Sequence, residues 1–268
     1  MDILSFLSYT FIQRSFIAGI SIALTCSALG IFLVLRKMSL IGDGLSHVSF
    51  GAIALGLFFG VYPMYVAIPF VMIASILILK ITEKAKVYGD AAIGIVSAIG
   101  IAGGVILASL SGGFTVDLFS YLFGNILSIS LPEVLLSVLL SFIVLLILTM
   151  NYWDLFSITF DEQYARTTGV KTSIMNGLLT ILTALTVVLS VKMVGVMLVS
   201  ALLILPATTA LQQDKSFRTS MLISGLVSVI SVLTGISISF LLDMPTGATI
   251  VMMNVLFFAF SLLWKKLR

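Results

Sequence analysis

Long apolar runs without a charged side chain recur along this chain, and they restrict its fold more than any other feature. One of them, Ser15–Leu35, would cover about 30 Å as a helix, which is the thickness of the hydrocarbon layer of a bilayer. The chain is 60% hydrophobic and 9% charged, with a mean hydropathy of +1.25. A soluble domain with this balance would expose one large apolar patch. The sequence therefore predicts an all-α, polytopic membrane protein.

Nine segments are long and apolar enough to be predicted as membrane-spanning helices. The predicted spans are about 15–36, 44–60, 63–81, 91–110, 132–151, 173–190, 194–212, 219–240 and 246–264. The turn residues Gly60–Pro63 separate the second span from the third. If one segment re-enters the membrane without crossing it, the total falls to eight. No stretch remains for a soluble domain, so residues 1–268 are predicted to form a single transmembrane domain.

Lysine and arginine are distributed unequally between the two sets of connections. Twelve of the 14 fall on one side: Arg36, Lys37, Lys80, Lys84, Lys86, Arg166, Lys171, Lys215, Arg218, Lys265, Lys266 and Arg268. Only Arg14 and Lys192 fall on the other. Because cytoplasmic connections carry the excess of basic residues, the C-terminus is predicted to be cytoplasmic. Asp117, Glu133 and Asp243 lie at the outer ends, where they are predicted to be solvated helix caps that could attract cations.

Asp43 and His47 interrupt the apolar sequence near the start of the second span, and His47 is the only histidine in the chain. Their spacing is one helical turn, so both side chains can face the same way. Ionisable residues within a membrane span are energetically unfavourable, so they are usually kept for a function. The alternative is that Asp43 is the N-cap of the second helix and His47 a packed, hydrogen-bonded residue.

The longest predicted cytoplasmic connection is Asp154–Lys171. Within it, Asp161 suits a helix N-cap and Gly169 a helix C-terminus, so a short capped helix is predicted between them. This helix could simply tie two spans together, or it could dock onto a partner. The chain has no Gly-x-x-x-x-Gly-Lys-Ser/Thr motif, so any ATP-driven work would require another subunit.

Several stretches resemble one family of permeases, in order and over nearly the whole chain. They are Gly42–His47 with Val48–Gly51, the pattern Glu162-x-x-Ala165-x-x-x-Gly169, Val194–Thr209 and Asp243–Ile250. The chain is similar to the zinc/manganese ABC importer permeases, which are relatives of the vitamin B12 and siderophore importers. In these permeases the cytoplasmic pattern belongs to the coupling helix that docks onto the ATPase.

The resemblance implies a plasma-membrane importer that works with several partners. These are a second copy of the chain, cytoplasmic ATP-binding subunits and an extracytoplasmic metal-binding protein. The chain is also expected to contact membrane lipid and to bind no nucleic acid. The chain itself would then be no enzyme, since the ATPase activity belongs to separate subunits. Glu162, Ala165 and Gly169 are expected to couple to the ATPase.

Asp43 and His47 correspond to the family's pore residues, so they are predicted to contact the transported ion. One chain offers only two ligands, whereas a two-fold dimer would offer two Asp and two His, enough for a four-coordinate site. No permanently bound cofactor is expected, only transported Zn²⁺ or Mn²⁺. Val48–Gly51 is closer to the zinc type, because manganese-type relatives are expected to carry an Ala-Val-Leu-Pro-Gly-like continuation. Zinc is therefore predicted, with manganese or iron(II) as the alternative.

Two other classes of function are weaker alternatives. A secondary transporter or channel would need more ionisable residues within the spans than the Asp43/His47 pair. It would also leave the predicted docking helix of the cytoplasmic connection without a function. An intramembrane metalloprotease would need a motif such as His-Glu-x-x-His, which a chain with one histidine cannot supply.

Overall fold

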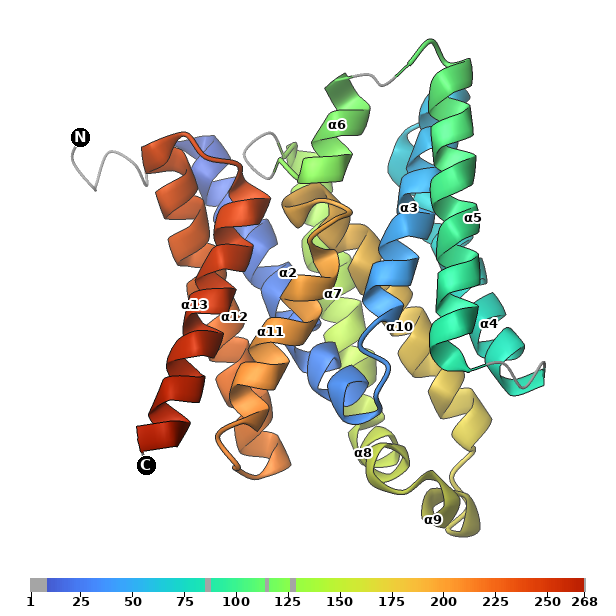
Figure 1. Cartoon of the computed structure of the whole chain (residues 1–268), viewed down its shortest axis with the longest axis vertical. Coiled ribbons are helices and arrows are strands. Elements are labelled where there is room, and N and C mark those ends of the chain that lie inside the picture. The colour runs from blue at the N-terminus through green and yellow to red at the C-terminus, as the bar shows by residue number, and fades with distance from the viewer. Residues whose placement is uncertain (1–8, 85–87, 114–115, 126–128, 268) are drawn as a thin grey trace.

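A computed structural model describes residues 9–84, 88–113, 116–125 and 129–267, and every regular element in these ranges is a helix. The helices are labelled in Figure 1. Their bounds are α2 Thr10–Leu35, α3 Ile41–Phe58, α4 Pro63–Lys84, α5 Gly89–Leu110, α6 Val116–Phe123, α7 Leu131–Met150, α8 Tyr152–Phe160, α9 Glu162–Thr167, α10 Thr172–Val194, α11 Val199–Leu211, α12 Phe217–Leu242 and α13 Thr246–Leu267. The predicted all-α fold is confirmed.

Eight helices in the described part of the chain are long and apolar enough to cross a membrane. They match eight of the nine predicted spans. The exception is the span predicted at 194–212, which is represented by the 13-residue helix α11. The preceding residues 195–198 are not helical, since Gly195 has φ +90° and ends α10. The prediction of a continuous helix at 194–212 is therefore wrong.

The chain runs back and forth between two ends of the bundle (Figure 1). The start of α2 lies at the top of the view and the end of α13 at the bottom, with α8 and α9 also at the bottom. The turn between α2 and α3 lies at the bottom as well, whereas α6 lies at the top. Many of the twelve lysines and arginines predicted to be cytoplasmic, including Arg36, Arg166 and Lys265, therefore lie at the end that holds α8 and α9.

The helices differ in how deeply they are buried. α2, α3 and α10 are the most buried spans, whereas α4, α5, α7, α12 and α13 each present much apolar surface outward, as helices facing lipid do. The packing between α3 and α5 is especially close. A Cβ on Gly100 would lie 2.6 Å from Val48 Cα, and one on Gly51 would lie 2.5 Å from the carbonyl oxygen of Gly100. Small residues thus let the two backbones touch, as is typical of membrane helices.

Candidate functional site

A tight turn places the start of α3 directly after the end of α2. Lys37 adopts the left-handed conformation with φ +58°. Its backbone N–H donates to the Val34 carbonyl at 3.1 Å, and the N–H of Met38 donates to the Leu33 carbonyl at 2.9 Å. These two hydrogen bonds form a Schellman motif, which satisfies carbonyls left free at the end of α2. Since α3 begins at Ile41, only a few bonded residues separate the two helices.

Asp43 and His47 lie in the first two turns of α3. The Nε2 atom of His47 is 3.5 Å from Oδ2 of Asp43, so the expected juxtaposition at one helical turn is present. The N-cap of α3 is Leu40, and Asp43 lies inside the first turn, where its charge interacts favourably with the helix dipole. The alternative that Asp43 caps this helix is therefore wrong.

The surface that α3 leaves uncovered forms a narrow stripe. Along Ile41–Gly56 the partly exposed residues are Asp43, His47, Gly51 and Leu55, and the others are buried. The side chains of Asp43 and His47 are 44% and 23% exposed, respectively. Both ionisable groups therefore remain reachable on a helix most of whose side chains are buried within its own chain.

Asp43 and His47 form no larger cluster of metal-ligating side chains with the other described residues of the chain. No group of three or more His, Cys, Asp or Glu side chains that could hold a metal occurs in the described ranges. The single cysteine, Cys26, is buried between α2 and α10 with its Sγ 3.2 Å from the Ser190 hydroxyl. One chain therefore presents two of the ligands that a divalent ion needs.

The non-helical residues between α10 and α11 are held by hydrogen bonds to the α6 region. The backbone N–H of Val196 donates to the Tyr121 carbonyl at 3.0 Å, and that of Asn125 donates to the Lys192 carbonyl at 3.1 Å. Gly195 packs against the backbone of Phe123, where a Cβ would lie 2.5 Å from a carbonyl carbon. Irregular backbone within a membrane protein requires such internal partners.

Glu133 lies in a buried polar cluster close to this break. Its Oε2 accepts hydrogen bonds from the N–H and hydroxyl of Ser130, both at 2.8 Å, and its Oε1 accepts one from the Tyr62 hydroxyl at 2.9 Å. Lys192 Nζ is 3.5 Å from Oε1 and lies 4.9 Å from the centre of the Tyr121 ring. Glu133 does cap α7, as predicted, through its bond from the Ser130 N–H. The prediction that this cap is solvated is wrong, because the Glu133 side chain is only 10% exposed.

The cluster also affects the turn residue Tyr62. Burial raises the pKa of the Tyr62 hydroxyl above its usual range, and the hydrogen bond to the Glu133 carboxylate raises it further.

The other two residues predicted as outer caps differ from Glu133. Asp243 is the exposed C-cap of α12, with φ +52°, whereas the side chain of Asp117 lies outside the described residues. The interior lysine at 192 was the one sequence signal that could have revealed this cluster.

The predicted short helix in the cytoplasmic connection is α9, and its predicted caps are confirmed. The Asp161 carboxylate accepts a hydrogen bond from the backbone N–H of Tyr164 at 2.9 Å. Gly169 has φ +92°, and the N–H groups of Gly169 and Val170 donate to the carbonyls of Arg166 and Ala165, which is again a Schellman motif. The preceding α8 is held to the bundle by aromatic contacts, including Phe156 against Phe217 with ring centres 5.1 Å apart.

The three predicted coupling residues occupy different environments on this connection. Ala165 is fully buried, so it packs against its own chain. Gly169 is exposed, and nothing lies within 4 Å of the position its Cβ would take. Tyr164 and Phe160 also project outward, with 64% and 60% of their surface exposed.

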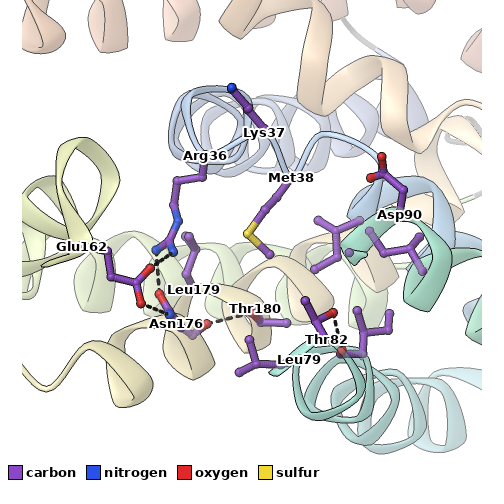
Figure 2. Close-up of a pocket in the computed structure, with 14 residues that line it drawn as sticks. Arg36, Lys37, Met38, Leu79, Thr82, Asp90, Glu162, Asn176, Leu179 and Thr180 are labelled. Carbon is purple, nitrogen blue, oxygen red and sulfur yellow. Dashed lines mark hydrogen bonds and ion pairs between the residues drawn. The ribbon is translucent and has the colours of Figure 1, made fainter. Parts of the chain in front are cut away.

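Glu162 forms contacts within the chain that the sequence did not reveal (Figure 2). Its Oε2 accepts from Nη2 of Arg36 at 2.9 Å, and its Oε1 accepts from Nδ2 of Asn176 at 3.0 Å. Arg36 Nη1 also donates to Oδ1 of Asn176 at 2.7 Å, which closes a ring of three side chains. Burial lowers the pKa of the Arg36 guanidinium, and the Glu162 carboxylate opposes this shift.

Comparison with known proteins identifies the family. The ABC 3 transport family matches residues 8–265. The manganese import system permease protein ScaB of Streptococcus parasanguinis is 34% identical over 253 residues, covering 94% of this chain and 90% of the relative. The manganese transport system membrane protein MntC of Halalkalibacterium halodurans is 31% identical over 255 residues, covering 95% and 87%.

Solved structures agree with this assignment. PsaBC from Streptococcus pneumoniae, in complex with Fab, superposes with a TM-score of 0.87 at 30% identity, covering 97% of this chain and 93% of the other. An inward-facing transporter described as of metal-chelate type superposes with a TM-score of 0.74 at 20% identity, covering 94% and 84%, and shows the fold alone. The chain therefore belongs to the ABC 3 transport family, and it is the plasma-membrane permease of a metal-importing ABC transporter.

Proposed function

We propose that this chain is the permease of a manganese(II) importer and that Asp43 and His47 contact the ion as it passes. The observation that carries the proposal is the pair itself, a carboxylate and an imidazole 3.5 Å apart on the exposed stripe of α3. Carboxylates suit Mn²⁺, and an imidazole is a common ligand of transition metals. The relatives named above are manganese permeases, which supports manganese over the zinc reading of the sequence.

The segment Val48–Gly51, on which the prediction of zinc relied, says little about which metal is transported. Val48 and Gly51 pack against Gly100 of α5, and Ser49 is fully buried. Their identities are therefore set by close packing between two helices. An Asp/His site binds Zn²⁺ more tightly than Mn²⁺ by intrinsic affinity, so the choice of metal depends on delivery and on release. Weaker binding of Mn²⁺ favours release after each passage.

Two copies of the chain would complete the site. Each contributes one carboxylate and one imidazole, and a two-fold axis beside the α3 stripe would bring four ligands together. Cytoplasmic ATP-binding subunits would dock at the end that holds α8 and α9, where Tyr164, Phe160 and Gly169 are exposed. The same end carries Arg166 and the basic end of α13, which agrees with a cytoplasmic C-terminus. An extracytoplasmic binding protein would deliver the metal to the opposite end.

The test is metal uptake by the permease reconstituted into liposomes with its ATP-binding subunits and metal-binding protein. Asp43→Asn and His47→Gln should each lower manganese uptake by more than about tenfold, since even residues that only orient a metal ligand are worth about 10–100-fold in affinity. The matched control is Asp214→Asn, which removes an exposed carboxylate between α11 and α12, outside α8 and α9, and should leave uptake unchanged. Normal uptake by both pore variants would refute the role of the pair. Stronger uptake of zinc or iron(II) than of manganese in competition would refute the choice of metal, and uptake without ATP would refute the importer.

A further inference from the structure

The ring formed by Arg36, Glu162 and Asn176, called here the cytoplasmic cluster, joins three segments that are far apart in the sequence. Arg36 is the C-cap of α2, Glu162 is the first residue of α9, and Asn176 lies in the second turn of α10. Figure 2 shows the three side chains converging beside the turn between α2 and α3. Both carboxylate oxygens of Glu162 are engaged, so the start of α9 is tied to the end of α2.

The ion pair in this cluster is only partly open to water. The Arg36 side chain is 11% exposed, whereas that of Glu162 is 41% exposed. Arg36 makes one hydrogen bond with each of two partners, at 2.9 Å to Glu162 and 2.7 Å to Asn176. A planar guanidinium that bonds two partners at once fixes their relative orientation, which a single flexible contact would not do.

From Arg36 the backbone continues to the metal pair through bonded turns. The Schellman motif at Lys37 and Met38 joins the end of α2 to the turn, and the N–H of Ile41 donates to the Met38 carbonyl at 3.1 Å. The N–H of Gly44 then donates to the Leu40 carbonyl at 3.1 Å. Asp43 lies within this bonded stretch. A displacement of Arg36 is therefore passed to the first turn of α3 and not absorbed by a slack loop.

A cavity of about 270 Å³ lies directly beside the cluster. It is lined by the turn between α2 and α3, by the end of α4, by the start of α5 and by α9 and α10 (Figure 2). Lys37, Met38 and Ile41 of the turn and of α3 contribute to its wall. Close-packed interiors resist displacement, whereas this space lets the turn shift without pushing packed side chains aside.

We propose that Arg36 is a positioning residue that transmits movement of α9 to the metal ligands on α3. This proposal rests on the proposed function, since it assumes that ATP-binding subunits move α9 and that Asp43 and His47 hold the ion. Glu162 then acts chiefly inside the permease, as the link between the docking helix and Arg36. The exposed residues Tyr164 and Gly169 are left to face the ATPase.

The experiment compares manganese transported per ATP hydrolysed in the reconstituted complex for the wild type and Arg36→Gln. The variant should keep its ATP-binding subunits during purification and still hydrolyse ATP, while the ratio of manganese to ATP falls at least about fivefold, the lower end of typical coupling between two sites. A role limited to stability would lower transport and hydrolysis together and leave the ratio unchanged. The matched control is Lys37→Gln, which removes the neighbouring cation in the same turn and should keep the wild-type ratio.

A second variant guards against misfolding of the first. Arg36→Gln combined with Glu162→Gln leaves no unpaired charge in the cluster, and its ratio should also fall. A wild-type ratio in either folded variant would overturn the proposal. Loss of the ATP-binding subunits from Arg36→Gln would also overturn it, because the cluster would then belong to the docking surface. If the wild-type complex itself transported no metal, the proposed function would fail first, which is a different outcome from a variant with an unchanged ratio.

Discussion

The buried ion pair between Glu133 and Lys192 provides a test of how this membrane protein is stabilised. The change is Glu133→Gln, which removes the charge but keeps an oxygen that can accept the two hydrogen bonds from Ser130. The helix cap at the start of α7 is thereby retained. The effect of the substitution then comes mainly from leaving the Lys192 ammonium without its counter-ion.

The structure sets the expected size of the effect. The side chains of Lys192 and Glu133 are 16% and 10% exposed, and their charged atoms are 3.5 Å apart. Removing one partner of a buried ion pair costs about 3–5 kcal/mol, because the other charge remains desolvated. Lys192 keeps its contact with the Tyr121 ring, which favours the lower end, about 3 kcal/mol. For a chain of this length that corresponds to a fall in Tm of about 6–12 °C.

The assay is thermal unfolding of the purified permease in detergent, with a second ion pair as the matched control. Lys265 Nζ and Asp214 Oδ2 are closer, at 2.6 Å, but their side chains are 51% and 73% exposed. Exposed pairs contribute about 0–1 kcal/mol, so Asp214→Asn should change Tm by less than about 4 °C. Asparagine also tolerates the left-handed backbone at this position, where φ is +51°.

A double substitution separates the ion pair from other effects. Glu133→Gln combined with Lys192→Met removes both charges and should recover at least half of the lost Tm, because no unpaired charge remains buried. The reasoning would be refuted if Glu133→Gln melted no lower than Asp214→Asn. It would also be refuted if the double variant were as unstable as the two single variants added together.

Three further substitutions, two of them with a matched control, test the packing and the caps by the same measurement. Gly100→Ala would place a Cβ 2.6 Å from a backbone carbon of α3 and should lower the free energy of unfolding by about 1–3 kcal/mol. The control Gly103→Ala, whose Cβ would meet nothing within 4 Å, should not destabilise the permease. Equal effects would refute the close contact of α3 with α5. Gly169→Ala should cost about 1–2 kcal/mol because its φ is +92°, whereas Gly177→Ala within α10 should be neutral or stabilising. Asp161→Ala should cost about 1 kcal/mol through loss of the N-cap, and a neutral result would contradict the capping hydrogen bond.

Hydropathy predicted most of the fold because membrane helices are set by composition and length. Eight of the nine predicted spans are long helices, and the turn at Gly60, with φ +66°, lies where it was predicted. The failure at 194–212 has a physical cause. A hydropathy window records how apolar a segment is but not its backbone dihedrals, and Gly195 permits a break that pairs with the α6 region.

Local patterns predicted the helix caps and the Asp43/His47 spacing, because both depend on residues a few positions apart. Contacts between distant residues could not be predicted in this way. The Tyr62 hydroxyl reaches Glu133 across 71 positions, and Arg36 reaches Glu162 across 126. Both carboxylates were therefore interpreted from their helix ends alone. The cap at Glu133 is present, but its burial beside Tyr62 and Lys192 could not be predicted, nor could the contacts of Glu162 with its own chain.

The most direct test of the central claim is pulsed electron paramagnetic resonance of Mn²⁺ bound to the permease dimer. His47 is the only histidine in the chain, so labelling histidine with ¹⁵N, without a histidine tag, marks this one imidazole. The account predicts one Mn²⁺ for every two chains, with ¹⁵N coupling that disappears in His47→Gln. Mn²⁺ bound without ¹⁵N coupling, or one ion per chain unaffected by Asp43→Asn and His47→Gln, would contradict it.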